Sequence, residues 1–303
     1  MRPSCRSRRD RRDPLTSPHE RSSARMLPVH PRLLSRRARI VSVLAAATAL
    51  LAGCTAPDPG AVASGASSAG HVVVDYAATT TPENETERRL LQDAGLLEAF
   101  AAWMEETVRL PMDITLVAKE CQDANAFYTA QDSTITVCYE LPASERVSLR
   151  ADGTADADID TQLLESAREV LFHEGGHALV AELDLAFTGR EEDVADQFSV
   201  YALTGTEADT DSLITVAKLY YLRAQAVTTI DELPFSDTHG LDAQRSANFL
   251  CYVYGAAPDR YDYLVTDGVL DGDRAAGCPE EYAQLTAGWS ALLAPFRTTS
   301  ATS

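Results

Sequence analysis

The sequence lacks a hydrophobic run long enough to cross a membrane as a helix. Its most apolar segment, IVSVLAAATALL at 40–51, has twelve residues, whereas a helical span needs about 20. None of its six cysteines forms a CxxC pair, so the usual spacing of cysteine-rich zinc sites is missing. Basic residues are also scarce, with 26 Lys+Arg against 45 Asp+Glu. This balance excludes nucleic-acid binding as the expected function, because such proteins neutralise phosphates with basic side chains.

The two ends of the chain carry opposite charges. Residues 1–53 contain twelve of the basic residues, all Arg, and only three of the acidic ones. Residues 54–303 are left with 14 basic and 42 acidic side chains, a net charge of −28. A difference of this size indicates two segments with separate roles, and we treat them separately.

The N-terminal segment has the pattern of an export signal. Arg36, Arg37 and Arg39 precede the apolar run, as in the positive region of a secretory signal peptide. The run ends in Leu-Ala-Gly-Cys at 51–54, which resembles a bacterial lipobox. That resemblance implies cleavage before Cys54, lipidation of its thiol and anchoring on the outer face of the cytoplasmic membrane. The alternative is an ordinary signal peptide followed by a coincidental cysteine.

Composition divides the chain into four parts. We assign residues 1–53 to the signal region; if translation starts at Met26, residues 1–25 are over-translated. Residues 54–70 are rich in Pro, Gly, Ala and Ser and predict a flexible tether. Residues 71–296 are long enough for one domain with a sizeable core. Residues 297–303 are expected to form a disordered tail.

Four cysteines lie within the expected domain. An even number in an oxidising compartment favours disulfides, and four cysteines allow three connectivities. We predict the two local pairs, Cys121–Cys138 and Cys251–Cys278. Zinc ligation by these cysteines is the competing interpretation, and the missing CxxC spacing argues against it.

Hydrophobic periodicity predicts an α+β domain in which the few strands precede most of the helices. The expected elements are a strand at 71–76, one helical stretch from 83 to about 108, a strand at 114–119, a hairpin at 126–140, a loop at 152–160, and helices at 161–183, 191–203, 212–227, 241–254 and 280–293.

The expected helix at 161–183 contains His173-Glu174-Gly175-Gly176-His177. Residues four apart share one face of a helix, so His173 and His177 can bind one Zn²⁺ while Glu174 reaches its open coordination position. Two adjacent glycines each cost about 1 kcal/mol in a helix interior. Their presence predicts that another element approaches the helix closely. The alternative is a pair of histidines that bind no metal.

The third ligand is expected on the following helix. The spacing of metzincins would place it at Leu183, which cannot bind a metal. Glu192 and Asp196 are four residues apart and share a face, so Glu192 can ligate while Asp196 accepts a hydrogen bond from a ligating histidine. Glu191 and Asp193 are expected to be solvated acids of the helix's first turn.

At these residues the sequence resembles the glutamate-zincins, the thermolysin-like clan, in which HExxH is followed by ExxxD on a second helix. A closer resemblance, over nearly all of residues 110–295, is to a bacterial family of uncharacterised metallopeptidases. It is carried by NAFY at 125–128, CYE at 138–140, FHEGGHAL at 172–179, GREEDVADQ at 189–197, His239, LDxQR at 241–245, Asn248, Cys251, YG at 254–255 and CxxEY at 278–282. The resemblance implies a zincin-like fold, a small sheet followed by a mainly helical part with the HExxH helix at the cleft.

The resemblance also implies the chemistry of a zinc metallopeptidase. His173, His177 and Glu192 would hold one catalytic Zn²⁺, and Glu174 would take a proton from a zinc-bound water as it attacks the peptide carbonyl. His239, in a Thr-His-Gly loop, is the candidate donor to the oxyanion of the transition state. The alternative for His239 is a helix cap.

Arg245 would assist this transition state or orient His239, and the alternative is a surface ion pair. Glu169 shares the face of His173 and is either a partner of the ligands or a solvated acid. Three functions remain open: a lipid-anchored zinc peptidase acting on peptides or proteins, a catalytically inactive zinc-stabilised binding lipoprotein, and an envelope protein in which HExxH is accidental. No residue pattern indicates an oligomeric state.

Overall fold

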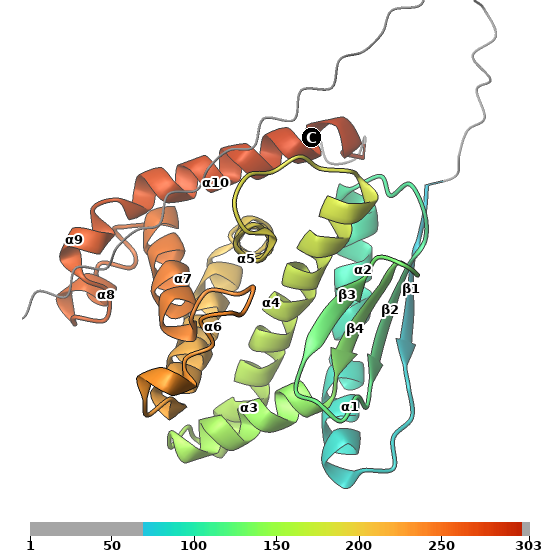
Figure 1. The fold of residues 1–303 in the computed structure, drawn as a ribbon, viewed down its shortest axis with the longest axis horizontal. Coiled ribbons are helices and arrows are strands. Elements are labelled where there is room, and N and C mark those ends of the chain that lie inside the picture. Colours follow the sequence, from blue (N-terminus) through green and yellow to red (C-terminus); the bar gives the residue numbers. More distant parts are fainter. Residues whose placement is uncertain (1–68, 299–303) are drawn as a thin grey trace, which may run out of the picture. The chain divides into compact units, whose positions relative to one another are not determined.

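The computed structural model describes residues 69–298 (Figure 1). The predicted signal region, most of the tether with Cys54, and residues 299–303 lie outside the described residues. The strands are β1 (Val72–Tyr76), β2 (Ile114–Lys119), β3 (Ala126–Thr129) and β4 (Thr134–Cys138). The longer helices are α1 (Pro82–Asp93), α2 (Leu96–Thr107), α3 (Glu140–Ala151), α4 (Asp156–Glu182), α5 (Glu191–Leu203), α6 (Glu207–Ala226), α7 (Asp242–Ala256) and α10 (Cys278–Leu293). Short helical turns are η1 (Ile230–Glu232), α8 (Tyr263–Thr266), α9 (Gly272–Ala275) and η2 (Ala294–Phe296).

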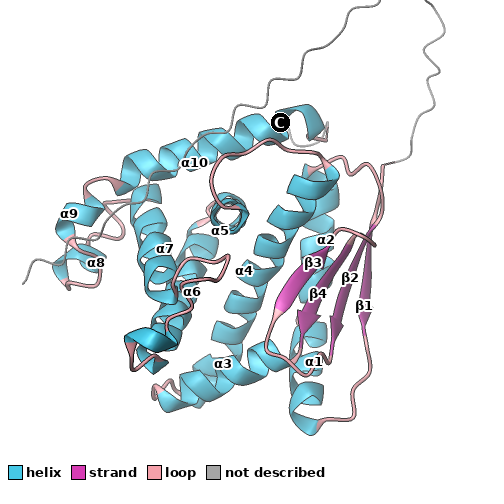
Figure 2. Cartoon of the chain, viewed as in Figure 1, coloured by secondary structure: helices cyan, strands magenta, loops and turns pink. Residues whose placement is uncertain are grey.

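The strands form one mixed sheet at one side of the domain (Figure 2). Its order is β1-β2-β4-β3, with β1, β2 and β4 parallel and β3 antiparallel to β4. Alternate residues of β2 are buried, as expected for a sheet that is covered mainly on one face. β3 is an edge strand, and it is the strand nearest to α4 (Figure 1). The predicted α+β class, with the strands ahead of most helices, is confirmed.

Three predicted boundaries were wrong. The stretch 83–108 is two helices, because Gly95 adopts a left-handed φ of 60° between them. Residues 156–160 belong to α4 rather than to a loop, since Asp156 and Asp158 favour the positive end of the helix dipole. Helix α6 begins at Glu207, five residues before its predicted start. The Thr206 side chain caps it there by accepting a hydrogen bond from the Asp209 N–H. Helix α3 had not been predicted at all.

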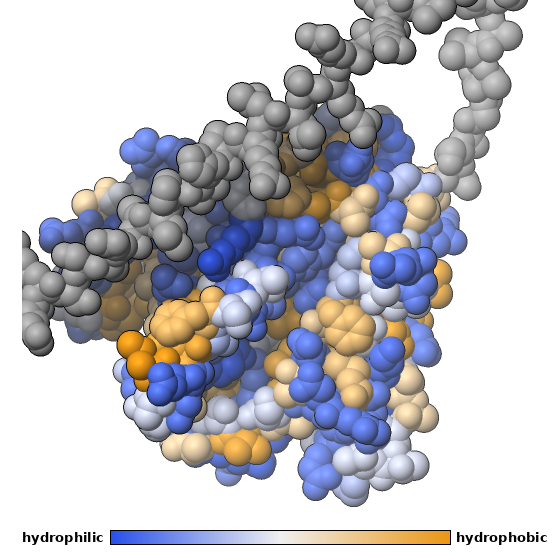
Figure 3. Space-filling view, in the orientation of Figure 1, coloured by the Kyte–Doolittle hydropathy of each residue, from blue (hydrophilic) through white to orange (hydrophobic). Residues whose placement is uncertain are grey.

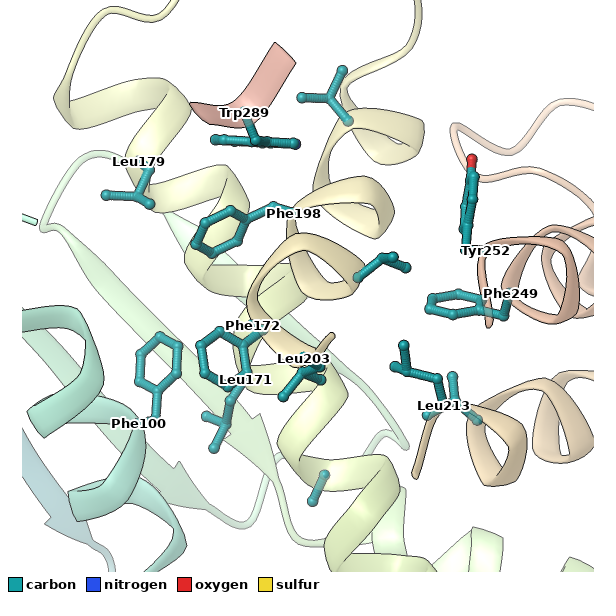
Figure 4. Packing of buried hydrophobic residues seen from close by; sticks show 14 of the residues in the cluster. Phe100, Leu171, Phe172, Leu179, Phe198, Leu203, Leu213, Phe249, Tyr252 and Trp289 are labelled. Atoms are coloured by element: carbon teal, nitrogen blue, oxygen red, sulfur yellow. The ribbon is translucent and has the colours of Figure 1, made fainter. Parts of the chain in front are cut away.

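The main core lies behind α4 and joins the sheet to the helical part. Phe100 and Trp103 of α2 meet Phe172 of α4 edge to face, with ring centroids 5.2 and 4.9 Å apart. Phe198 of α5 in turn packs against Trp289 of α10 at 4.6 Å (Figure 4). These aromatic side chains are close-packed on the side of α4 that faces away from the cleft. They hold α4 and α5 in a fixed relation to each other.

Both predicted disulfides are confirmed, Cys121–Cys138 beside the sheet and Cys251–Cys278 between α7 and α10. The second joins helices that approach closely, because a Cβ on Gly255 would lie 2.4 Å from the Cys278 carbonyl oxygen. Arg297, the first residue of the predicted tail, pairs with Val108 in an isolated bridge. Within residues 69–298, no helix combines the length and apolar composition that membrane crossing requires.

Replacing Cys251 and Cys278 together by serine is expected to lower the free energy of unfolding by about 3 kcal/mol. The bond closes a loop of 27 residues and so restricts the unfolded chain. Urea unfolding monitored by tryptophan fluorescence measures the change. An unchanged midpoint would mean that this disulfide contributes nothing to stability, and the Cys121–Cys138 pair serves as the comparison.

Candidate metal centre

A cleft of about 830 Å³ runs between the edge strand β3, helix α4 and the loop that precedes α7. Helix α4 presents His173, Glu174 and His177 to this cleft, and α5 presents Glu192 from its first turn. His173 and Glu174 are almost completely buried, whereas the cleft itself is open to solvent. The four residues singled out from two sequence motifs are therefore together in one site.

Glycine in α4 allows α5 to reach this position. A Cβ on Gly176 would lie 3.0 Å from the Ala195 Cα and 3.1 Å from the Phe198 Cβ. A Cβ on Gly175 would lie 2.9 Å from the ring of Phe100. The close approach that the Gly-Gly pair predicted is confirmed, and the approaching element is the helix that carries Glu192.

Three donor atoms converge at the floor of the cleft. The Nε2 atoms of His173 and His177 are 3.2 Å apart, and the Glu192 Oε2 atom lies 3.3 and 3.2 Å from them. Ligand atoms of a tetrahedral zinc ion with bonds of about 2.0–2.1 Å lie about 3.3 Å from one another. The observed triangle therefore has the dimensions that zinc requires.

The tautomers of the two histidines also favour a metal ion between the three donor atoms. His173 Nδ1 donates to Asp196 Oδ1, and His177 Nδ1 donates to Glu191 Oε1, both at 2.8 Å. Because ionised carboxylates only accept, the proton of each neutral imidazole is held on Nδ1. When both imidazoles are neutral, their Nε2 lone pairs face the Glu192 carboxylate, and three acceptors this close repel one another unless a proton or a metal cation lies between them. The donor set fits a divalent metal with a preference for nitrogen and oxygen.

The site favours positive charge strongly. Burial by itself would lower the pKa of His173, but the hydrogen bonds with Asp196 and Glu192 outweigh it and raise that pKa to about 10. Burial likewise opposes ionisation of Glu192, yet its three imidazole neighbours, His173, His177 and His239, hold its pKa far below the usual range. Protons and a metal cation compete for these same nitrogens, so metal affinity falls as pH falls.

Asp196 is the centre of a buried network behind the donor set. Arg245 binds it with two nitrogens, Nε to Oδ2 at 2.9 Å and Nη2 to Oδ1 at 2.5 Å. Burial would raise the pKa of Asp196, but the guanidinium of Arg245 and the imidazole of His173 lower it. Glu169, also buried, accepts a hydrogen bond from Ser199 and lies beside both Asp196 and His173. The guanidinium of Arg245 is therefore paired with the Asp196 carboxylate.

Glu174 lines the cleft next to the donor set without belonging to it. Its side chain is buried, and burial raises the pKa of its carboxyl above the ordinary value. A carboxylate with a raised pKa accepts a proton more readily near neutral pH, which is the property that a general base needs.

His239 reaches the site from the loop before α7. Its Nε2 lies 2.9 Å from Glu192 Oε2, and its Nδ1 lies 3.0 Å from Asp237 Oδ1. Its ring stacks on His173 with centroids 5.8 Å apart. The cluster of donor atoms consists of His173, His177 and Glu192, and His239 lies outside it. It is placed as a hydrogen-bond donor that faces the cleft, and it does not cap α7.

Four residues of this site were not predicted from the sequence. Glu191, taken for a solvated acid, orients His177, while Asp237 orients His239. Thr238 donates to Glu192 Oε1 at 3.2 Å, and Arg190 donates to the His239 carbonyl at 3.4 Å. Of these four, only Glu191 could have been predicted, because a histidine that binds a metal normally donates its other ring N–H to a nearby acceptor.

Asp196→Asn is expected to weaken zinc binding about 10- to 100-fold, because the amide leaves the His173 tautomer unfixed and Arg245 unpaired. Competition with a fluorescent zinc chelator measures the affinity. Glu191→Gln, at the more exposed partner of His177, is expected to have a smaller effect. Equal zinc affinity of the Asp196→Asn variant and the parent would contradict the orienting role.

A family model described as "putative metallopeptidase" matches residues 76–293. No curated protein and no solved structure matches the chain. The matched segment contains the whole donor set, Glu174 and His239, and it spans more than two thirds of the sequence. The chain therefore belongs to this metallopeptidase family.

Proposed function

We propose that the protein is a zinc-dependent metallopeptidase of the glutamate-zincin type that hydrolyses peptide bonds in its cleft. The observation that carries this proposal is the triangle of His173 Nε2, His177 Nε2 and Glu192 Oε2, with sides of 3.2–3.3 Å and the buried Glu174 beside it. Membership of a metallopeptidase family supports a metal and a peptidase function. The finer assignment, zinc with glutamate as base, rests on the chemistry of these side chains.

Each residue of the site has its own role in peptide hydrolysis. His173, His177 and Glu192 would hold the ion, and the ion would supply Lewis-acid chemistry by polarising a carbonyl and acidifying water. Glu174 accepts the proton of the attacking water and passes it to the leaving nitrogen. His239 donates through Nε2 to the developing oxyanion, with Asp237 holding its Nδ1. To do so, His239 exchanges its contact with Glu192 for one with the substrate.

The free edge of β3 supports a peptide as substrate. Asn125 accepts a hydrogen bond from Cys138, and Tyr128 faces Ile135 in the antiparallel pairing. Because hydrogen-bonded and non-bonded pairs alternate, the main chain of Tyr128 is turned away from β4, toward the cleft that it lines. An extended peptide can add to this edge as a further strand and run past Glu174.

We further propose that the protein acts outside the cytoplasmic membrane, anchored through a lipid on Cys54. The positive segment, the short apolar run and the Leu-Ala-Gly-Cys sequence support this location. The two disulfides of the domain agree with it, because they persist in oxidising compartments.

Incubation of the zinc-loaded protein with a mixed peptide library tests the proposal. Cleavage products that appear with zinc, disappear with a chelator and return when zinc is added back are expected. A protein that binds one zinc tightly and cleaves no peptide would instead be a zinc-stabilised binding module. A folded protein without zinc affinity would overturn both functions.

A further inference from the structure

The loop between α6 and α7, residues 227–241, exposes two large apolar side chains. Ile230 is 72% exposed and Phe235 is 67% exposed. The same loop ends in Asp237, Thr238 and His239, all of which line the cleft. A large apolar side chain that is exposed next to a cleft can contact the ligand that binds there.

Hydrogen bonds hold this loop in a defined conformation at both ends. At its start, Glu232 accepts from the backbone N–H groups of Thr228 and Thr229 at 2.8 and 3.2 Å. At its end, the Asp237 N–H donates to the Pro234 carbonyl at 2.9 Å, which closes a turn around Phe235. The bond from Thr238 to Glu192 Oε1 then ties this turn to the donor set. Phe235 does not itself line the cleft, but this turn holds it two residues before Asp237, which does.

The opposite wall of the cleft also has an exposed aromatic ring. Phe127 of β3 is 39% exposed and lines the cleft. Figure 3 shows hydrophobic side chains on both sides of a hollowed, hydrophilic band. The polar floor thus has apolar margins on the strand side and on the loop side.

The charged side chains around the cleft limit which polypeptide segments can bind between these apolar margins. The loop carries Asp231, Glu232 and Asp237 and no Lys or Arg, and Glu191 adds a further exposed carboxylate at the cleft. Apart from the histidines, Arg190 is the one basic side chain that lines this cleft within the described residues. An acidic segment would be repelled, whereas a neutral or basic one would not.

We propose that Phe235 is a specificity-determining residue that contacts a bulky apolar side chain of the bound polypeptide. The substrate class is then an extended polypeptide with such a side chain near the scissile bond, in a neutral or basic context. This inference rests on the proposed peptidase function, because it assumes a peptide along β3. Beyond that function, it specifies which substrate side chains the cleft prefers and which residue of the protein causes the preference.

Peptide binding without turnover tests the inference. The zinc-loaded Glu174→Gln variant is titrated with fluorescent decapeptides of Ser and Gln, in which a single Phe is moved through every position. We expect at least one Phe position to bind about tenfold more tightly than the peptide without Phe. Adding Phe235→Ser should abolish that gain, and Phe235→Leu should keep most of it.

Ile230→Ser is the matched control, because Ile230 is a similarly exposed apolar residue of the same loop but lies seven residues before Asp237, the first residue of the loop that lines the cleft. It should leave the gain unchanged. A gain that survives Phe235→Ser, or that Ile230→Ser removes equally, would overturn the role of Phe235. Zinc content and the thermal midpoint of each variant verify its fold. Cleavage by the chain with Glu174 intact is measured separately, so a failed peptidase function and a failed specificity assignment remain distinguishable.

Discussion

Glu192→Ala is expected to bring the zinc content of the purified protein from about one ion per chain to nearly none after mild dialysis. The carboxylate supplies one of three donor atoms, and its Oε2 lies 3.2–3.3 Å from both histidine nitrogens. Two histidines on one helix retain a zinc ion poorly, because structural and catalytic zinc sites use at least three protein ligands. We expect the affinity to fall by more than the roughly 100-fold that loss of an outer partner causes.

The matched control for this variant is Asp193→Ala, which removes an exposed carboxylate from the next position of the same helix. It changes the net charge equally but is expected to keep the full zinc content. Elemental analysis at equal protein concentration, together with circular dichroism, separates metal loss from unfolding. Retention of zinc by a folded Glu192→Ala protein would show that the third ligand is another residue.

Glu174→Gln is expected to lower the rate constant of peptide hydrolysis by a factor of about 10²–10⁴ while the zinc content stays at that of the parent. The amide has nearly the same shape but accepts no proton, and Glu174 is not one of the three donors. Burial already disfavours the ionised form of this carboxyl and raises its pKa. The free energy of unfolding should therefore be unchanged or slightly higher in the variant.

Single-turnover cleavage of a library-derived peptide measures this rate. Asp158→Asn, an exposed acid near the start of the same helix, is the control that should keep parental activity. Full activity of Glu174→Gln would exclude Glu174 as the base. Loss of zinc together with activity would mean that Glu174 supports the metal rather than the proton transfer.

The sequence alone determined those parts of the site that lie within one element. Four-residue spacing places His173 with His177 on one face of a helix, and Glu192 with Asp196 on one face of the next, because the α-helical period does not depend on the rest of the fold. The Gly-Gly pair likewise predicted a closely packed neighbour, because the space that a missing Cβ leaves is a property of the glycine position itself. Both disulfides could also be predicted from the sequence, because cysteines separated by a short loop tend to pair with each other.

Only the tertiary structure decided which elements meet. Arg245 binds Asp196 across 49 residues of sequence, and His239 reaches Glu192 across 47. Glu191 orients His177 instead of facing water, and the edge of β3 lines the cleft. Such contacts depend on how helices cross and how a loop is anchored, and these are set by packing of the whole core. Periodicity along the chain carries no information on that packing, whereas it fully specifies which residues share a helix face.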